Sequence, residues 1–180
     1  MNPHDELTAL LRLFPQADEL VESAEHVAPA LVPEPFKRLL VHDHHMTVTM
    51  EEFYNCRVNV RVLEERESQG LYCRMILLES NETEQVVQFG IVRFNFEYVT
   101  EAVRDEILSR EIPLGRVLIN HNVLRHIDLG AMLKIKLGPK MAEYFSAPVG
   151  AETYGRLATI FCNGQPAVDL LEVASPFAED

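Results

Sequence analysis

The segment "LYCRMILLES" (residues 71–80) decides which fold this sequence predicts. It is mostly apolar, and polar turn residues stand on both sides of it, "RESQG" at 66–70 and "NETE" at 81–84. Such a run between turn signals is typical of a buried strand. The flanking segments "RVNVRVLEE" (57–65) and "QVVQFGIVRFNF" (85–96) have the same strand character. Together the three segments predict an antiparallel meander.

The rest of the chain extends this sheet and adds helices around it. Strand character returns in "NVLRHIDLGAMLKIKL" (122–137) and in a hairpin at 153–174 around Asn163-Gly164, a strong hairpin signal. In the first third of the chain, helices are expected over 4–25 with a break at Pro15, over 35–41, and near 50–54, where Thr49 and Glu52 have the form of a capping box. Further helices are expected over 100–110, with Thr100 as the N-terminal cap, and from Pro113 onward. The pattern predicts an α+β fold, with an antiparallel sheet of about six strands covered on one face by helices.

Composition limits the classes of partner. The chain has 180 residues, a net charge of −12 and three cysteines, none in a CxxC motif. A field of this sign repels nucleic acid and anionic membranes, and no Lys/Arg cluster offsets it. No apolar run approaches the roughly 20 residues of a membrane span, and the N-terminus does not resemble a secretory signal. We expect a cytoplasmic protein with reduced, mostly buried thiols that binds neither nucleic acid nor membrane.

A cluster of histidines in "LLVHDHHMTVTMEEF" (39–53) raises the hypothesis of a metal site. His42, His44 and His45 have neither the i,i+4 spacing of a helical ligand pair nor a companion CxxC motif. The sequence also lacks the motifs of a serine nucleophile, a dinucleotide site and a P-loop. We therefore expect neither a metal nor a cofactor, and a metal-binding protein is only a third hypothesis.

Charged residues within apolar strands are the stronger candidates for a site. Arg74 interrupts "LYCRMILL", and burying a guanidinium without a partner is costly. Arg74 therefore has a carboxylate partner, reaches solvent from an edge strand, or binds an anionic ligand. Asp169 and Glu172 stand three residues apart in a predicted strand, so they face opposite sides of the sheet. The spacing leaves open which of them points into a pocket.

Four segments, taken in this order, resemble the chorismate pyruvate-lyase family, also called 4-hydroxybenzoate synthases. They are "LLVHDHHMT" (39–47), "YCRMILLE" (72–79), "IPLGRVLI" (112–119) and "YGRLATIFCNGQPAVDLLEVASP" (154–176). The resemblance covers residues 38–176, and it implies a single chorismate lyase-like domain over 1–180, preceded by a helical segment at 1–37. It also implies an internal ligand pocket under helical flaps.

The resemblance implies an activity as well. Members of this family convert chorismate to 4-hydroxybenzoate and pyruvate without a cofactor, as in ubiquinone biosynthesis. A small-molecule substrate, chorismate or a related cyclic carboxylate, is then the expected partner. The alternative is a non-catalytic domain of the same fold that binds an aromatic acid, as the ligand-sensing domains of certain bacterial transcription regulators do.

Four residues of this sequence match functional residues of that family. Arg74 matches the arginine that holds the ring carboxylate, and Glu172 matches a late glutamate that acts as an acid/base group or as a partner of the ring hydroxyl; these two are the expected catalytic residues. Leu114 and Met46 match residues that line the substrate pocket. The match is imperfect, because Glu172 stands eight residues after Gly164, one more than in the family. A β-bulge would absorb the extra residue; otherwise Leu171 takes that place, or Asp169 substitutes.

Overall fold

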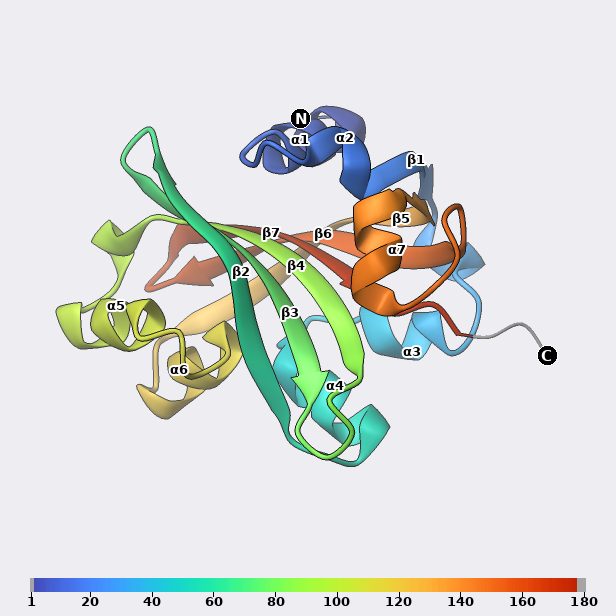
Figure 1. Cartoon of the computed structure of the whole chain (residues 1–180). Coiled ribbons are helices and arrows are strands. Elements are labelled where there is room, and N and C mark those ends of the chain that lie inside the picture. The colour runs from blue at the N-terminus through green and yellow to red at the C-terminus, as the bar shows by residue number, and fades with distance from the viewer. Residues whose placement is uncertain (1, 178–180) are drawn as a thin grey trace.

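A computed structural model describes residues 2–177 as a seven-stranded antiparallel sheet with helices around it (Figure 1). The strand order is β1-β5-β6-β7-β4-β3-β2, so the meander β2-β3-β4 forms one side of the sheet. The strands are β1 (Val21–Val27), β2 (Val58–Ser68), β3 (Leu71–Ser80), β4 (Val86–Phe94), β5 (Arg125–Leu137), β6 (Glu152–Cys162) and β7 (Gln165–Ala174).

Helices cover both faces of this sheet (Figure 1). The helices are α1 (Pro3–Leu11), α2 (Ala17–Leu20), α3 (Phe36–Leu40), α4 (Met46–Tyr54), α5 (Glu101–Leu108), α6 (Leu114–Asn120) and α7 (Pro139–Phe145). Two single 3₁₀ turns, Pro29–Leu31 and Phe96–Tyr98, complete the chain. No helix among residues 2–177 is both long and apolar enough to cross a bilayer.

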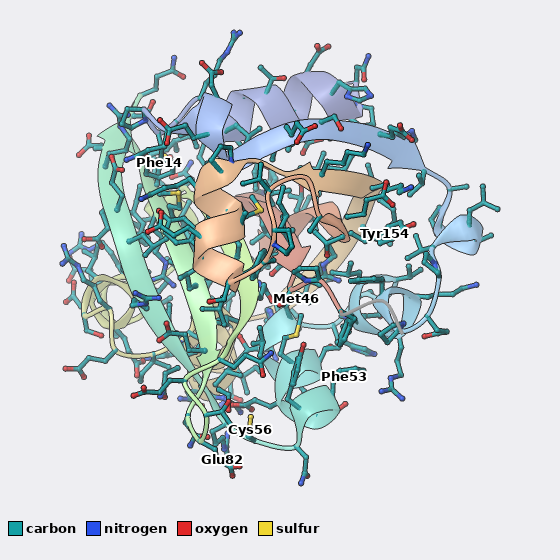
Figure 2. All side chains as sticks on the ribbon, turned by 45° about the vertical axis from the view of Figure 1, so that its right-hand side comes forward. Phe14, Met46, Phe53, Cys56, Glu82 and Tyr154 are labelled. Carbon is teal, nitrogen blue, oxygen red and sulfur yellow. The ribbon has the colours of Figure 1, made fainter. Side chains whose placement is uncertain are left out.

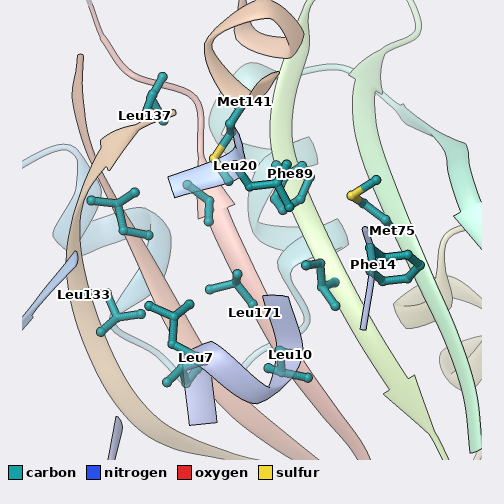
Figure 3. Packing of buried hydrophobic residues seen from close by; sticks show 14 of the residues in the cluster. Leu7, Leu10, Phe14, Leu20, Met75, Phe89, Leu133, Leu137, Met141 and Leu171 are labelled. Atoms are coloured by element: carbon teal, nitrogen blue, oxygen red, sulfur yellow. The ribbon is translucent and has the colours of Figure 1, made fainter. Parts of the chain in front are cut away.

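Helices α1, α2 and α7 pack on one face of the sheet, which we call the first face (Figure 3). Leu10, Phe14 and Met141 from this side meet Phe89 and Leu171 from the strands. Alternate residues of each strand point this way because side chains alternate across a strand. All five side chains are nearly inaccessible to solvent, so the first face is a closed core.

The opposite, second face carries two clusters of apolar residues instead of one. Helices α5 and α6 pack over one cluster, which includes Phe94, Ile107 and Leu118. Helices α3 and α4 pack over the other, which includes Met46 and Leu78. A functional site on this face would therefore lie where α4 and α6 meet, above the central strands.

The structure confirms the predicted fold class, an α+β antiparallel sheet flanked by helices, and corrects several details. The sheet has seven strands because β1, in the segment expected to be helical (1–37), pairs with β5. Most side chains of this edge strand are exposed or only half-buried, so no period-two apolar pattern marks it. Helices cover both faces, not one. That residues 1–180 form a single domain stays a prediction.

Two predicted helix starts had different outcomes. The Thr100 side chain accepts a hydrogen bond from the Val103 N–H, which confirms the cap of α5. Helix α4 begins at Met46, with His45 before it, so a capping box of Thr49 and Glu52 does not form. Thr49 instead lies inside the helix, where its N–H donates to the His45 carbonyl.

Candidate functional site

A cavity of about 40 Å³ lies between the second face of the sheet and the N-terminal ends of α4 and α6. Its size is enough for a few water molecules. Figure 2 shows Met46 at the inner end of α4, toward the middle of the molecule. The lining residues are His45, Met46, Thr47, Val60, Arg74, Ile76, Leu78, Gln88, Gly90, Val92, Pro113, Leu114, Gly115, Ile160, Leu170 and Glu172.

The structure brings together the four residues that match functional residues of the lyase family. Met46, Arg74, Leu114 and Glu172 come from α4, β3, α6 and β7, and each lines this cavity. The sequence analysis missed His45 as a lining residue, and it missed Gln88 altogether. A polar residue between apolar neighbours in β4 was the available signal for Gln88, the same signal that identified Arg74 in β3.

Strand register places these side chains in rows across the floor of the cavity. Arg74 lies opposite Val92, Ile76 opposite Gly90, and Leu78 opposite Gln88. Gly90 also faces Glu172 of β7, so it stands at the centre of the floor. A Cβ atom on Gly90 would lie 3.2 Å from Cδ1 of Ile76. Ile76 therefore packs closely over Gly90, and a larger residue at this position would crowd the floor of the cavity.

A β-bulge in β7 sets the direction of Glu172. Pro166 pairs with Phe161 and Val168 pairs with Ile160, which leaves Ala167 as an extra residue between the two pairs. Glu172 then lines the cavity, while Leu171 points into the core of the first face. The bulge expected from the spacing after Gly164 is present, and Leu171 does not take the place of the glutamate.

Asp169 does not substitute for Glu172 either. It lies on the first-face side of β7, where Arg93 Nη2 donates to its carboxylate at 2.7 Å. This ion pair is partly exposed, with 28% of the arginine side chain and 34% of the aspartate side chain accessible. Asp169 is therefore outside the cavity.

Arg74 is a buried cation without a carboxylate partner among residues 2–177. Its exposed fraction is 1%. One nitrogen, Nη1, donates to the Ile107 carbonyl at 3.3 Å, whereas Nε has no hydrogen-bond partner in residues 2–177. Burial lowers the pKa of this guanidinium, and only Tyr72 and Glu65 nearby oppose that shift. The unpaired Nε–H is the donor that an anion in the cavity would satisfy.

Gln88 adds a second unpaired polar group to the same cavity. The residue is 3% exposed, and its Oε1 has no partner among the described residues. Buried polar groups are paired in the great majority of cases, so each exception calls for a cause. Only three side-chain atoms in residues 2–177 are buried and unpaired, and two of them, on Arg74 and Gln88, line one cavity.

Arg156 links Glu172 of the cavity floor to the loop that precedes α4. It is completely buried, and its Nε donates to Glu172 Oε2 at 2.7 Å. Its two terminal nitrogens donate to the carbonyls of His42 at 2.8 Å and His44 at 3.0 Å. Arg156 thus neutralises Glu172 and pins residues 41–45, here called the histidine loop, to the sheet.

The histidines of this loop make structural hydrogen bonds. His42 Nε2 donates to the Leu39 carbonyl at 2.7 Å, so its Nδ1 accepts from the His44 N–H. His45 Nε2 accepts from Arg125 Nε at 2.8 Å. Among the residues that the structure describes, no three His, Cys, Asp or Glu side chains converge as metal ligands.

Half-buried His42 and buried His45 both have lowered pKa values, so both are neutral near pH 7. Burial, with the Arg156 cation next, lowers the pKa of His42 to about 4. Burial, with the Arg125 cation next, lowers the pKa of His45 to about 4. In the unfolded chain the same imidazoles titrate near 6.5. The unfolded state therefore binds more protons between these two values, and stability falls as the pH falls through that window.

We predict that the free energy of unfolding decreases when the pH is lowered from about 7 to about 5, with His45 contributing on the order of 2 kcal/mol. Urea unfolding at a series of pH values measures this slope. His45→Gln should remove part of it, whereas His126→Gln, at an exposed position, should leave it unchanged. Equal slopes in the parent protein and the His45 variant would contradict the prediction.

The fold is shared with the ligand-binding domain of a bacterial transcriptional regulator and with PhnF. The ligand-binding domain of a GntR-family transcriptional regulator from Bordetella bronchiseptica is 10% identical with a TM-score of 0.52, over 68% of this chain and 92% of that one. PhnF from Mycobacterium smegmatis is 9% identical with a TM-score of 0.54, over 80% of this chain and 69% of that one. The effector domain of PhnF is 8% identical with a TM-score of 0.52, over 73% of this chain and 88% of that one.

No protein-family model matches the sequence, and no curated protein matches it. At these low identities the structural similarities define a fold, which is the chorismate lyase-like fold expected from the sequence.

The same comparisons correct the identification made from motifs. Assignment to the chorismate pyruvate-lyase family is wrong, and the expectation of a lyase is overturned with it, because no family model matches the sequence and the similar structures reported above are the ligand-binding domain of a transcriptional regulator and the effector domain of PhnF. Glu172, expected to act as an acid/base, is bonded to Arg156 instead. Chorismate, 4-hydroxybenzoate and pyruvate therefore lose their support as substrate and products. The roles of Arg74 and Glu172 in the site stay predictions.

Proposed function

We propose that this protein binds a small organic anion, a carboxylate or a phosphate ester, in the cavity between α4, α6 and the sheet, without transforming it. The observation that carries the proposal is the Nε–H of Arg74, which is buried at the cavity and has no hydrogen-bond partner among residues 2–177. The similarity in fold to the ligand-binding domain from Bordetella bronchiseptica supports the same class of function. The exclusion of nucleic acid rests on net charge alone and stays a prediction.

The energetics of Arg74 favour an anionic ligand over a neutral one. A buried guanidinium has lost its hydration, and a carboxylate or phosphate recovers that loss through charge-assisted hydrogen bonds. Arg74 makes no ion pair within residues 2–177. The planar guanidinium can present Nε and a terminal nitrogen together to two oxygens of one anion.

The apolar part of the cavity limits the ligand to a small body. Ile76, Leu78 and Val92 form the floor beside Gly90, and Met46 and Leu114 form the roof. The present volume of about 40 Å³ is large enough for only a few water molecules, so a larger ligand needs the roof helices to move apart. They are tightly packed: a Cβ atom on Gly115 of α6 would lie 3.0 Å from Cβ of His45.

Arg74→Met tests the proposal, because methionine keeps much of the side-chain length and removes the charge. The measurement is the melting temperature against a panel of small carboxylates and phosphate esters. We expect several of these anions to stabilise the parent protein, since a ligand that binds the native state raises its stability by mass action. We expect the Arg74 variant to fold and to lose that response.

Arg93→Met is the matched control. Arg93 lies on the first-face side of the sheet, paired with Asp169, so its loss leaves the cavity untouched. The control variant should respond to the same anions as the parent protein. An undiminished response in Arg74→Met, or no response to any anion in the parent protein, would overturn the proposal.

A further inference from the structure

We propose that Gln88 is a specificity-determining residue, which selects anions that carry a hydrogen-bonding group, such as a hydroxyl, at the end remote from the charge. This inference rests on the proposed function, because it concerns the second end of the same ligand. It names a class of ligand: a short molecule with an anionic head at Arg74, an apolar middle over Gly90 and a polar tail at Gln88.

The environment of Gln88 favours an apolar residue, so the presence of an amide there calls for a functional reason. Its neighbours in β4 are Val87 and Phe89, and it faces Leu78 of β3. The side chain is 3% exposed, and Oε1 is unpaired within residues 2–177. A leucine would pack there without leaving a polar atom unbonded. An unpaired buried amide lowers stability unless a ligand pairs with it.

The register of the sheet places Arg74 and Gln88, the two polar ends of the cavity floor, apart from each other. Arg74, Ile76 and Leu78 follow one another on the cavity face of β3, and their partners on β4 are Val92, Gly90 and Gln88. Successive residues on one face of a strand are roughly 6.6 Å apart. Arg74 and Gln88 are thus two rows apart, with the row of Gly90 between them.

Glu172 lies in the middle row, one row from Gln88, and places a second hydrogen-bond acceptor beside the polar end. It lies opposite Gly90, and Arg156 occupies only its Oε2. Its other carboxylate oxygen makes no hydrogen bond to the described residues, so it can accept one from the ligand. A hydroxyl satisfies this site well, because it donates to a carboxylate and pairs with an amide in either orientation. A methyl group in the same place would leave these acceptors unpaired.

Matched ligands test the inference. Each ω-hydroxy acid of a short series is compared with the alkanoic acid that carries a methyl in place of the hydroxyl, for example 4-hydroxybutyrate against pentanoate. A parallel pair, 2-hydroxyethyl phosphate against propyl phosphate, distinguishes the two kinds of head group. Isothermal titration should give about tenfold tighter binding for the hydroxyl member of the pair that fits.

Gln88→Leu should abolish that preference while its melting temperature without ligand stays equal to or above that of the parent protein. Gln16→Leu is the control, because Gln16 carries the third buried unpaired atom but lies outside the cavity; it should keep the preference. Gln88→Met, which keeps the side-chain length, serves as the second variant if Gln88→Leu fails to fold.

The outcomes separate this inference from the proposed function. Anions that bind through Arg74 with equal affinity for both members of every pair would overturn the role of Gln88 and leave the proposed function standing. A preference that survives in Gln88→Leu would do the same. Failure of every anion to bind would overturn the proposed function, and this inference with it.

Discussion

Replacing Arg156 by methionine is expected to lower the free energy of unfolding by about 3–5 kcal/mol. The substitution leaves Glu172 without its ion-pair partner beneath the cavity and removes the donors that hold the carbonyls of His42 and His44. Removing one partner of a buried ion pair lowers stability by more than the intact pair adds to it, because the remaining charge stays desolvated. Denaturant unfolding, followed by circular dichroism, measures the change.

Two further variants show whether the unpaired charge causes the loss. Arg156→Met combined with Glu172→Leu should recover part of the stability, since an apolar pair of similar size often replaces a buried ion pair at little cost. Arg57→Met removes an arginine that is 69% exposed and should change stability by less than about 1 kcal/mol. If Arg156→Met behaves like Arg57→Met, Arg156 does not hold the histidine loop.

Replacing Gly90 by leucine is expected to weaken binding of the anionic ligand by at least about a hundredfold while the fold persists. The new side chain enters the cavity beside Ile76 and occupies the place of the ligand's apolar middle. Overpacking of this kind costs about 1–3 kcal/mol of stability. Isothermal titration and denaturant unfolding on the same samples separate lost binding from lost fold.

A matched control for Gly90→Leu overpacks the first face instead. Ala131 is 6% exposed in the core of that face, outside the cavity, so Ala131→Leu should cost comparable stability. Its affinity for the ligand should stay that of the parent protein. Equal losses of affinity in the two variants would show that the effect comes from general strain. Gly90→Ala should give an intermediate result, because Ile76 needs to shift by only a few tenths of an ångström.

The central sheet could be predicted from the sequence because its strands are buried and strongly patterned. Strands β2, β3 and β4, and the hairpin β6-β7, follow directly from apolar runs and turn residues. Strand β1 escaped prediction, since an edge strand with charged, exposed residues has no apolar face to reveal it. Its identity depends on pairing with β5, which lies more than a hundred residues away in the chain.

The site was partly predictable for a similar reason. Arg74 stands out because a charge in an apolar strand needs an explanation, and Glu172 follows from the spacing after the hairpin once the bulge at Ala167 is included. The pairing of Arg156 with Glu172 depends on register between β6 and β7, so no local pattern shows it. The motif resemblance located the cavity and its residues but gave the wrong chemistry, because positions in a fold persist when functions differ.

The most direct test of the central claim observes the Arg74 Nε–H itself. A ¹H–¹⁵N spectrum of arginine Nε groups, recorded during titration with an anion that stabilises the protein, reports whether this donor acquires a partner. The signal is assigned by its absence in Arg74→Lys, and Arg93 Nε, already bonded to Asp169, serves as the internal reference. Anion binding should shift the Arg74 signal and leave that of Arg93 in place. Saturating anion with an unmoved Arg74 signal would contradict the account.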